Sequence, residues 1–145
     1  MDVESLYPLV TEAIRRAEVL ADLNAPGVRS AHLDVSLLEE RIAGFLPASD
    51  PEGAIARRGA VRAAIEAHEF QRARQLADQF TSQDGVSDAL RATLHQLADE
   101  ASKLALHGSE LIAMRYPRAS ARFGIDEIRR VAQQFSGQGA PFPIC

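Results

Sequence analysis

The chain has 145 residues, of which 46% are hydrophobic and 25% charged, and these fractions are close to the averages of soluble globular domains. A chain of this length buries roughly 68–70% of the surface that its unfolded form exposes, so its core needs neither metals nor disulfides. The composition therefore excludes an intrinsically disordered chain and a disulfide scaffold. No apolar run approaches the roughly 20 residues that span a bilayer, and the N-terminus Met1-Asp2-Val3-Glu4 is acidic where a signal peptide would be basic. We expect one cytoplasmic domain without membrane contact.

The formal net charge is −4, whereas a general nucleic-acid binder carries a concentrated basic face, so we do not expect a nucleic-acid partner. The charge alternates along the chain and sums to −6 over residues 1–56, +2 over 57–80, −3 over 81–110 and +3 over 111–145. Such alternation is typical of a solvated surface whose opposite charges meet across helices. One lysine stands against fifteen arginines, which we interpret as the bias of a GC-rich bacterial genome.

Helical periodicity dominates the first third of the chain. The first predicted helix ends near Asn24 and shows one apolar face, formed by Leu6, Leu9, Val10, Ala13, Ile14, Ala17, Leu20 and Ala21. The stretch from Val28 to Val35 is ambiguous. Ser36-Leu37-Leu38-Glu39 is a capping box, in which the hydroxyl and the carboxylate each satisfy a free amide at a helix start. It predicts a second helix that runs from there to Leu46, with Leu38, Ile42 and Phe45 on its apolar face, and Pro47 closes it.

The remaining elements are also helical. A second capping box, Ser49-Asp50-Pro51-Glu52, opens a third helix with Ile55, Val61, Ala64 and Ile65 as its buried stripe, and a fourth helix has Phe70, Ala73, Leu76, Ala77 and Phe80 on one face. The longest helix follows a polar break at Thr81 to Gly85 and ends before Pro117, and a last one runs from Gly124 to Phe135. No segment alternates with period two. The sequence predicts an all-α bundle of five or six helices in one domain over residues 1–135, followed by a flexible tail over 136–145 that carries the single cysteine, Cys145.

No motif specific for catalysis, phosphate binding or a cofactor occurs along the chain. The pairs His95 with Asp99 and His107 with Glu110 share one predicted helix, and no second helix offers a matching set of ligands, so we expect no metal. The adjacent carboxylates Glu39 and Glu40 diverge by about 100° on a helix and cannot act together on one substrate. We interpret them as a solvated helix face. The sequence favours a non-catalytic protein without catalytic residues, metal or cofactor.

The middle of the chain carries a local motif. The run from Ala63 to Asp78 contains Ala-Ala-Ile, an acidic residue before a phenylalanine, an alanine three residues later and a Leu-x-Asp pair. Over residues 59–80 it resembles the UVR motif, the helical hairpin of bacterial excision-repair proteins and of the middle domain of Clp-type ATPases, although Ala77 stands where that family usually has arginine. The resemblance implies a protein-docking hairpin linked to proteostasis. Close packing of small residues in any tight helical hairpin explains the same pattern.

Two functions remain open from the sequence. The first is a protein-interaction or adaptor module that acts as a homodimer. Its contacts are expected on the longest helix and on the hairpin, at Phe70, Leu97, Leu104 and Leu111. The second is a small-molecule or anion-binding protein, or an enzyme, with a site lined by arginines. Its candidates are Arg62, Arg72, Arg74, Arg115, Arg118 and Arg122, of which the last three lie with Tyr116 and Phe123 in one short segment.

Overall fold

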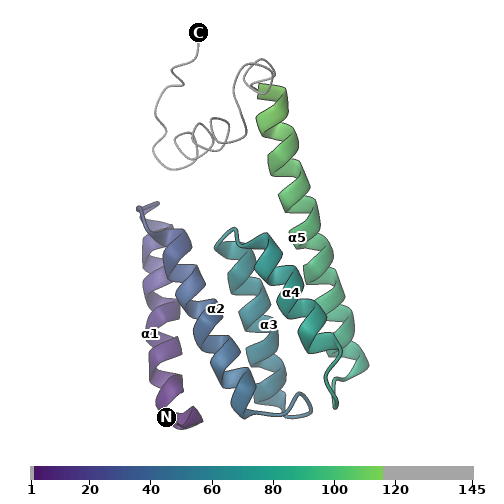
Figure 1. Cartoon of the computed structure of the whole chain (residues 1–145). Helices are drawn as coiled ribbons and strands as arrows, with labels where there is room; N and C mark the ends of the chain where they lie inside the picture. The colour runs from purple at the N-terminus through teal and green to yellow at the C-terminus, as the bar shows by residue number, and fades with distance from the viewer. Residues whose placement is uncertain (1, 116–145) are drawn as a thin grey trace. The chain divides into compact units, whose positions relative to one another are not determined.

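The computed structural model describes residues 2–115 and, of these, the side chains of residues 2–107. Its five helices are α1 (Val3–Asp22), α2 (Val28–Phe45), α3 (Pro51–Glu66), α4 (Phe70–Thr81) and α5 (Asp88–Arg115). Successive helices lie side by side and run in opposite directions (Figure 1). The described part of the chain contains no strand, which confirms the predicted all-α class. The sixth predicted helix and the predicted tail over 136–145 lie outside the described residues.

Contacts within the chain divide it after Lys103. The first unit holds α1 to α4 and the beginning of α5, and the rest of α5, from Leu104 on, belongs to the second unit. The predicted single domain over 1–135 includes residues beyond the described ones and stays a prediction. None of the helices within residues 3–115 has the length and apolar character that crossing a membrane requires.

The start of α2 differs from the sequence-based prediction. The helix begins at Val28 after Gly27, whose φ of 89° is in the left-handed region and whose carbonyl accepts the N–H of Ala31. Ser36, predicted to cap the helix, is instead fully buried in its interior. Its hydroxyl donates a hydrogen bond to the carbonyl of Ala60 at 2.7 Å and accepts one from Arg72 at 3.2 Å. The Ser-x-x-Glu pattern is therefore a packing contact between helices and not a cap.

The beginning of α3 and the turn into α4 lie where the sequence predicts them, with Pro51 in the first turn of α3. The cap is Asp50 and not Ser49 of the predicted capping box, because the side chain of Asp50 accepts the N–H of Glu52 at 2.8 Å. The predicted hairpin turn is present, with His68 in the left-handed region at a φ of 60°. The N–H of Glu69 reaches back to the carbonyl of Ala64, and the His68 ring stacks on Phe70 at 5.4 Å. Residues 59–80 therefore form a helical hairpin.

The core is built around α3, where small residues let the neighbouring helices approach closely. Val61, Leu6, Phe80 and Leu94 are completely or almost completely buried and come from four different helices. Several side chains that the periodicity predicts to be buried are exposed: Leu9 (46%), Ile14 (36%), Phe45 (51%) and Ile55 (55%). For Leu9, Ile14 and Ile55 the reason is that α1 lies at the edge of the bundle and α3 leaves one face uncovered, so the buried stripe of each helix is narrower than its apolar stripe. Phe45 is the last residue of α2.

Candidate functional site

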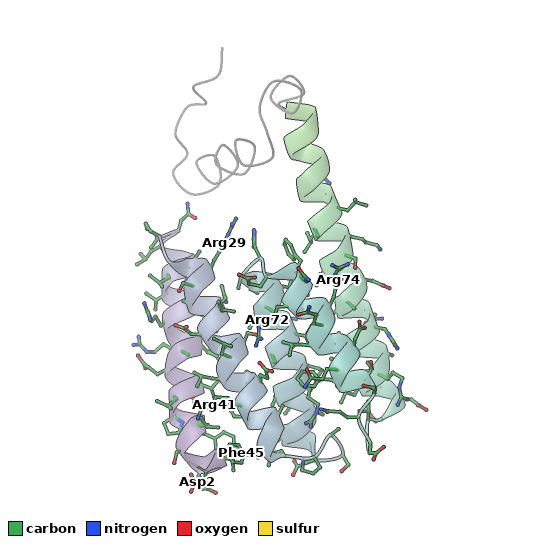
Figure 2. The ribbon with its side chains drawn as sticks, in the orientation of Figure 1. Asp2, Arg29, Arg41, Phe45, Arg72 and Arg74 are labelled. Carbon is green, nitrogen blue, oxygen red and sulfur yellow. The ribbon has the colours of Figure 1, made fainter. Side chains whose placement is uncertain are left out.

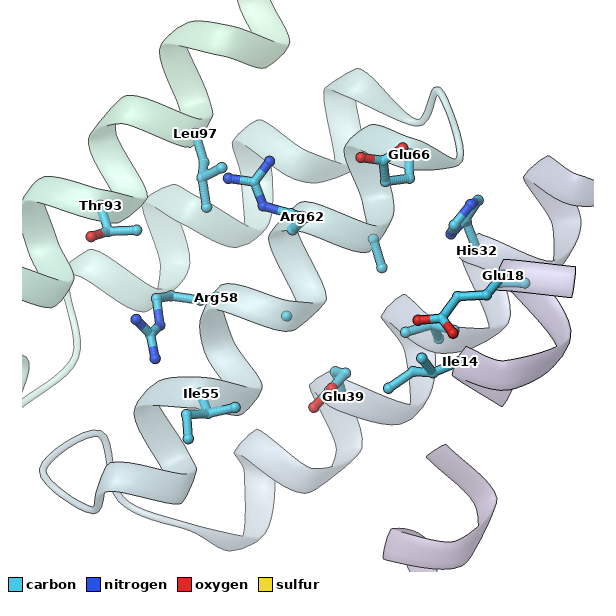
Figure 3. Close-up of a pocket in the computed structure, with 14 residues that line it drawn as sticks. Ile14, Glu18, His32, Glu39, Ile55, Arg58, Arg62, Glu66, Thr93 and Leu97 are labelled. Atoms are coloured by element: carbon cyan, nitrogen blue, oxygen red, sulfur yellow. The ribbon is translucent and has the colours of Figure 1, made fainter. Parts of the chain in front are cut away.

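The first unit has a groove along α3. It has a volume of about 640 Å³ and lies between α1 and α2 on one side and α5 on the other (Figure 3). Its apolar lining consists of Ile14, Ala17, Val35, Ile55, Ala63 and Leu97. Its polar lining consists of Glu18, His32, Glu39, Arg58, Arg62, Glu66 and Thr93. The groove thus combines exposed apolar surface with charges of both signs.

The sequence of α3 explains why this face stays open. Arg58 and Gly59 follow Ile55 by three and four residues, and Arg62 follows them by four and three, so all four share one side of the helix. The opposite side carries the buried residues, including Ala60 and Ala64. Ile55 is 55% exposed although it is a large aliphatic side chain, and water contact at such a side chain is unfavourable. A ligand that covers Ile55 would remove that cost.

Glu39 of α2 reaches the floor of the groove at Gly59. A Cβ atom at position 59 would lie 2.9 Å from Oε1 of Glu39 and 3.0 Å from its Cδ, so only glycine leaves room for this carboxyl group. Burial raises the pKa of Glu39 to about 7, because the apolar surroundings disfavour the charged form. Among residues 2–107, no side chain forms an ion pair or hydrogen bond with this carboxyl group.

The charges of the groove are separated across its width. Glu18 and Glu39 lie on the side of α1 and α2, whereas Arg58 and Arg62 lie toward α5 (Figure 3). Arg62 has a partner, since its Nη1 lies 3.7 Å from a carboxylate oxygen of Glu100 on α5. Arg58 forms no ion pair within the part of the chain that the structure describes. The groove therefore offers a free guanidinium group on one flank and free carboxyl groups on the other.

One hydrogen bond joins α1 to the beginning of α3. The hydroxyl of Tyr7 on α1 donates a hydrogen bond of 2.6 Å to Oε2 of Glu52 at the start of α3. This bond, reinforced by burial and nearby carboxylates, raises the pKa of Tyr7 to about 12. Glu52 precedes Ile55 by about one helical turn. The hydrogen bond therefore holds α1 and α3 together next to the end of the groove where Ile55 lies.

Arg57, next to Arg58 in sequence, has a structural role that the sequence did not reveal. It is 4% exposed and donates to the carbonyls of Ala43, Leu46 and Gly53 and to the side chain of Gln83, at distances of 2.7–3.1 Å. Burial lowers the pKa of Arg57. Its cation satisfies carbonyls at the C-terminal end of α2, where a positive charge is favourable. Arg57 is thus part of the core and does not face the groove.

The arginines predicted to bind an anion do not converge within the described residues. Arg72 is half-buried and pairs with Glu40 at 2.7 Å, while Arg74 points to solvent two residues further along α4 (Figure 2). Residues two apart on a helix face nearly opposite directions. The side chain of Arg115, and the whole of Arg118 and Arg122, lie outside the described residues. Of the three named arginines whose side chains the structure describes, Arg62, Arg72 and Arg74, only Arg62 lines the groove.

The predicted partner-binding residues lie in different environments. Phe70 is half-buried and packs against the core. Leu97 is 4% exposed and belongs to the core, where it also lines the groove, so it is not an exposed contact on α5. Its predicted place at a contact between two copies stays a prediction. Leu104 is 41% exposed, and the side chain of Leu111 lies outside the described residues.

Other sequence-based interpretations can be compared with the structure. Within residues 2–107, no group of three or more His, Cys, Asp or Glu side chains is arranged to hold a metal ion. Glu39 and Glu40 diverge as predicted, because one faces Gly59 and the other pairs with Arg72. The interpretation as a solvated face is wrong, since both side chains are partly buried against neighbouring helices.

Sequence reasoning missed the residues that define the groove, namely Glu39, Arg58 and Gly59. One signal was present: a glycine inside a helical pattern indicates a close approach to that position. Comparisons of the chain with family models, with curated proteins and with solved structures give no match. The interpretation of the groove therefore depends on its own chemistry.

Proposed function

We propose that this chain is a non-catalytic, cytoplasmic protein-interaction module, and that the groove along α3 binds a segment of a partner protein. The observation that carries the proposal is the groove itself, in which the exposed side chain of Ile55 lies between the charged groups of Arg58 and Glu39 (Figure 3). Binding sites commonly combine apolar contact area with a few polar groups that orient the ligand. An adaptor role in proteostasis accords with the UVR-like hairpin.

The proposal includes a homodimer formed through α5. Leu104 and Leu106 are large aliphatic side chains, 41% and 64% exposed. A second copy that covers Leu104 would bury this apolar surface in an isologous contact. The dimer contact and the groove involve different residues, because every residue that lines the groove precedes Leu104 in the chain.

In-cell photocrosslinking tests the groove as a protein-binding site. A photoreactive benzoylphenylalanine replaces Ile55 in the groove and, as a matched control, Gln79, which is exposed on α4. We expect discrete protein adducts from position 55 in the cells that produce the protein, and we expect the additional substitution Arg58→Glu to abolish them. Equal adducts from both positions, or none from position 55, would contradict the proposal.

A further inference from the structure

We propose that the segment bound in the groove is an amphipathic α-helix of a partner protein. Its apolar stripe covers Ile55, a cationic side chain on one flank pairs with Glu39, and a carboxylate on the other flank pairs with Arg58. This inference deepens the proposed function and rests on it. Three observations carry it: the walls of the groove, the separation of its charges and its concave shape.

The walls of the groove favour a helix over an extended peptide. All four elements that line it, α1, α2, α3 and α5, are helices, whose backbone N–H and C=O groups bond within each helix. An extended peptide needs a sheet edge to pair its own backbone groups, and in an apolar groove they would stay unpaired at considerable cost. A helix satisfies its own backbone and presents side chains at the spacing that fits between other helices. The groove therefore matches a helical ligand.

The charges of the groove specify the two flanks of that helix. Glu39 lies in the floor beside α2 without a partner among residues 2–107, and Arg58 is similarly free on the side toward α5. Both lie beside the exposed side chain of Ile55, so a bound helix that covers Ile55 would partly remove them from water. Charges removed from water need opposite charges. A helix with basic and acidic flanks exchanged would place like charges together, so the groove also determines the direction of binding.

Binding of a cation at Glu39 is coupled to proton release. Its carboxyl group, with a pKa of about 7 in the free protein, must ionise to form the pair. The groups facing it are Glu18 from α1, His32 from α2 and Arg58, Arg62 and Glu66 from α3, while α5 contributes the uncharged Thr93 and Leu97. Because the ionised fraction of a group with this pKa rises about tenfold between pH 6 and 8, affinity should rise by up to about tenfold over the same interval.

The concave shape argues against a second copy of this face as the occupant. Two grooves facing each other across a two-fold axis would touch only at their rims, which would leave Ile55 uncovered. A free anion is disfavoured by Glu18, Glu39 and Glu66, which line the same space. A protruding helix with both charges fits the groove without these conflicts.

Phage display of a helical peptide library on the full-length protein tests the proposal. The library places randomised residues on the exposed positions of a stable helical scaffold, and the selected peptides are then synthesised for fluorescence anisotropy. We expect an apolar i, i+3, i+4, i+7 stripe with lysine or arginine on one flank and Asp or Glu on the other. Ile55→Asp should abolish binding, and Arg58→Glu should weaken it by about tenfold or more. As a control, Arg74→Glu on α4 should leave it unchanged.

The substitution Glu39→Gln separates this proposal from general apolar binding. This substitution should lower the affinity for peptides with a basic flank by about tenfold at pH 8, and it should remove the rise in affinity between pH 6 and 8. Three outcomes would overturn the proposal of a helical ligand: selected peptides without a basic flank, peptides that bind equally well to Ile55→Asp, or a library without enrichment. If crosslinks from position 55 persist in that case, the groove still binds protein and only the nature of its ligand is wrong. If the crosslinks are also absent, the proposed function itself fails.

Discussion

The carboxyl group of Glu39 lies directly beside the backbone of Gly59, and a methyl group at position 59 would approach its Oε1 to 2.9 Å. Glycine inside a helix costs roughly 1 kcal/mol relative to alanine. Here that cost leaves space for a carboxyl group on the floor of an apolar groove. The glycine lowers the stability of the helix, and the partial burial of the carboxyl group is also unfavourable for its charged form. Features that lower stability in this way are expected at a binding site.

We predict that Gly59→Ala stabilises the protein while displacing Glu39. The obstructing atoms are the far end of a flexible side chain, which can rotate toward solvent, so the gain in helix propensity of about 1 kcal/mol should prevail at neutral pH. Gly53→Ala is the matched control, because its methyl group would lie 2.1 Å from the backbone carbonyl oxygen of Pro47, which cannot rotate away. Urea unfolding should show opposite signs for the two variants. A destabilised Gly59→Ala would show that Glu39 is held in place.

We predict that Glu39→Gln changes the pH dependence of stability. The pKa of Glu39 is raised to about 7 from a usual value of 4.5, so the folded protein holds this proton more tightly than the unfolded chain. The stabilisation by the protonated form is complete below about pH 4.5 and is lost as the pH rises through 7. The loss is at most roughly 3 kcal/mol, and partial exposure reduces it. Urea unfolding should therefore show Glu39→Gln to be more stable than the unmodified protein at pH 8, with no such advantage at pH 4.5.

Glu40→Gln is the control for this measurement. Glu40 is the neighbouring residue on α2, but it pairs with Arg72 at 2.7 Å, so its removal leaves a half-buried guanidinium group without its carboxylate. We expect Glu40→Gln to destabilise the protein at pH 8, opposite in sign to Glu39→Gln. The same sign for both variants would contradict the different environments of the two carboxyl groups.

Much of the fold was predictable because it depends on local patterns. The apolar spacing of residues 70–80 predicted α4, and Pro51 marked the first turn of α3, because helix starts depend on neighbouring residues. The cap itself is Asp50 and not the predicted Ser49. Ser36 shows where such reasoning fails. Its sequence context is that of a cap, but a carbonyl of another helix, at Ala60, competes for the hydroxyl. Which partner prevails depends on packing between helices that are distant in sequence.

The groove was less predictable than the fold, for the same reason. Arg57 and Arg58 are adjacent and chemically identical, but one is buried in the core and the other lines the groove. Helix geometry predicts that they point about 100° apart, but not which direction is covered. Ile55 likewise fits the buried stripe by spacing and is exposed because no helix of the described residues covers that face.

The two arginines give a further prediction. Arg57→Lys should destabilise the protein by about 2–3 kcal/mol, because a lysine ammonium cannot reach three backbone carbonyls and Gln83 at once and leaves buried acceptors unpaired. Arg58→Lys keeps the charge at an exposed position and should change stability by less than about 0.5 kcal/mol. Thermal unfolding of both variants checks this difference. Equal effects would argue against the buried network of Arg57.

The proposed dimer is testable at Leu104. This side chain is 41% exposed, so Leu104→Glu does not bury a charge inside the chain and should leave the helix content measured by circular dichroism largely intact. In a dimer that covers Leu104, the glutamate would be desolvated without a partner, which is strongly unfavourable. Light scattering should therefore show about twice the 15.7 kDa chain mass for the unmodified protein and a single chain for Leu104→Glu.

Leu106→Glu provides the matched control for the dimer interface. Leu106 is 64% exposed and lies two residues from Leu104, nearly on the opposite side of α5, so a contact centred on Leu104 does not cover it. The Leu106→Glu variant should remain a dimer. Dissociation of both variants would indicate a broader or differently placed interface, because a single helix face cannot include both positions. A mass of one chain for the unmodified protein at micromolar concentration would exclude the dimer altogether, and binding of a helix in the groove would then be a property of the monomer.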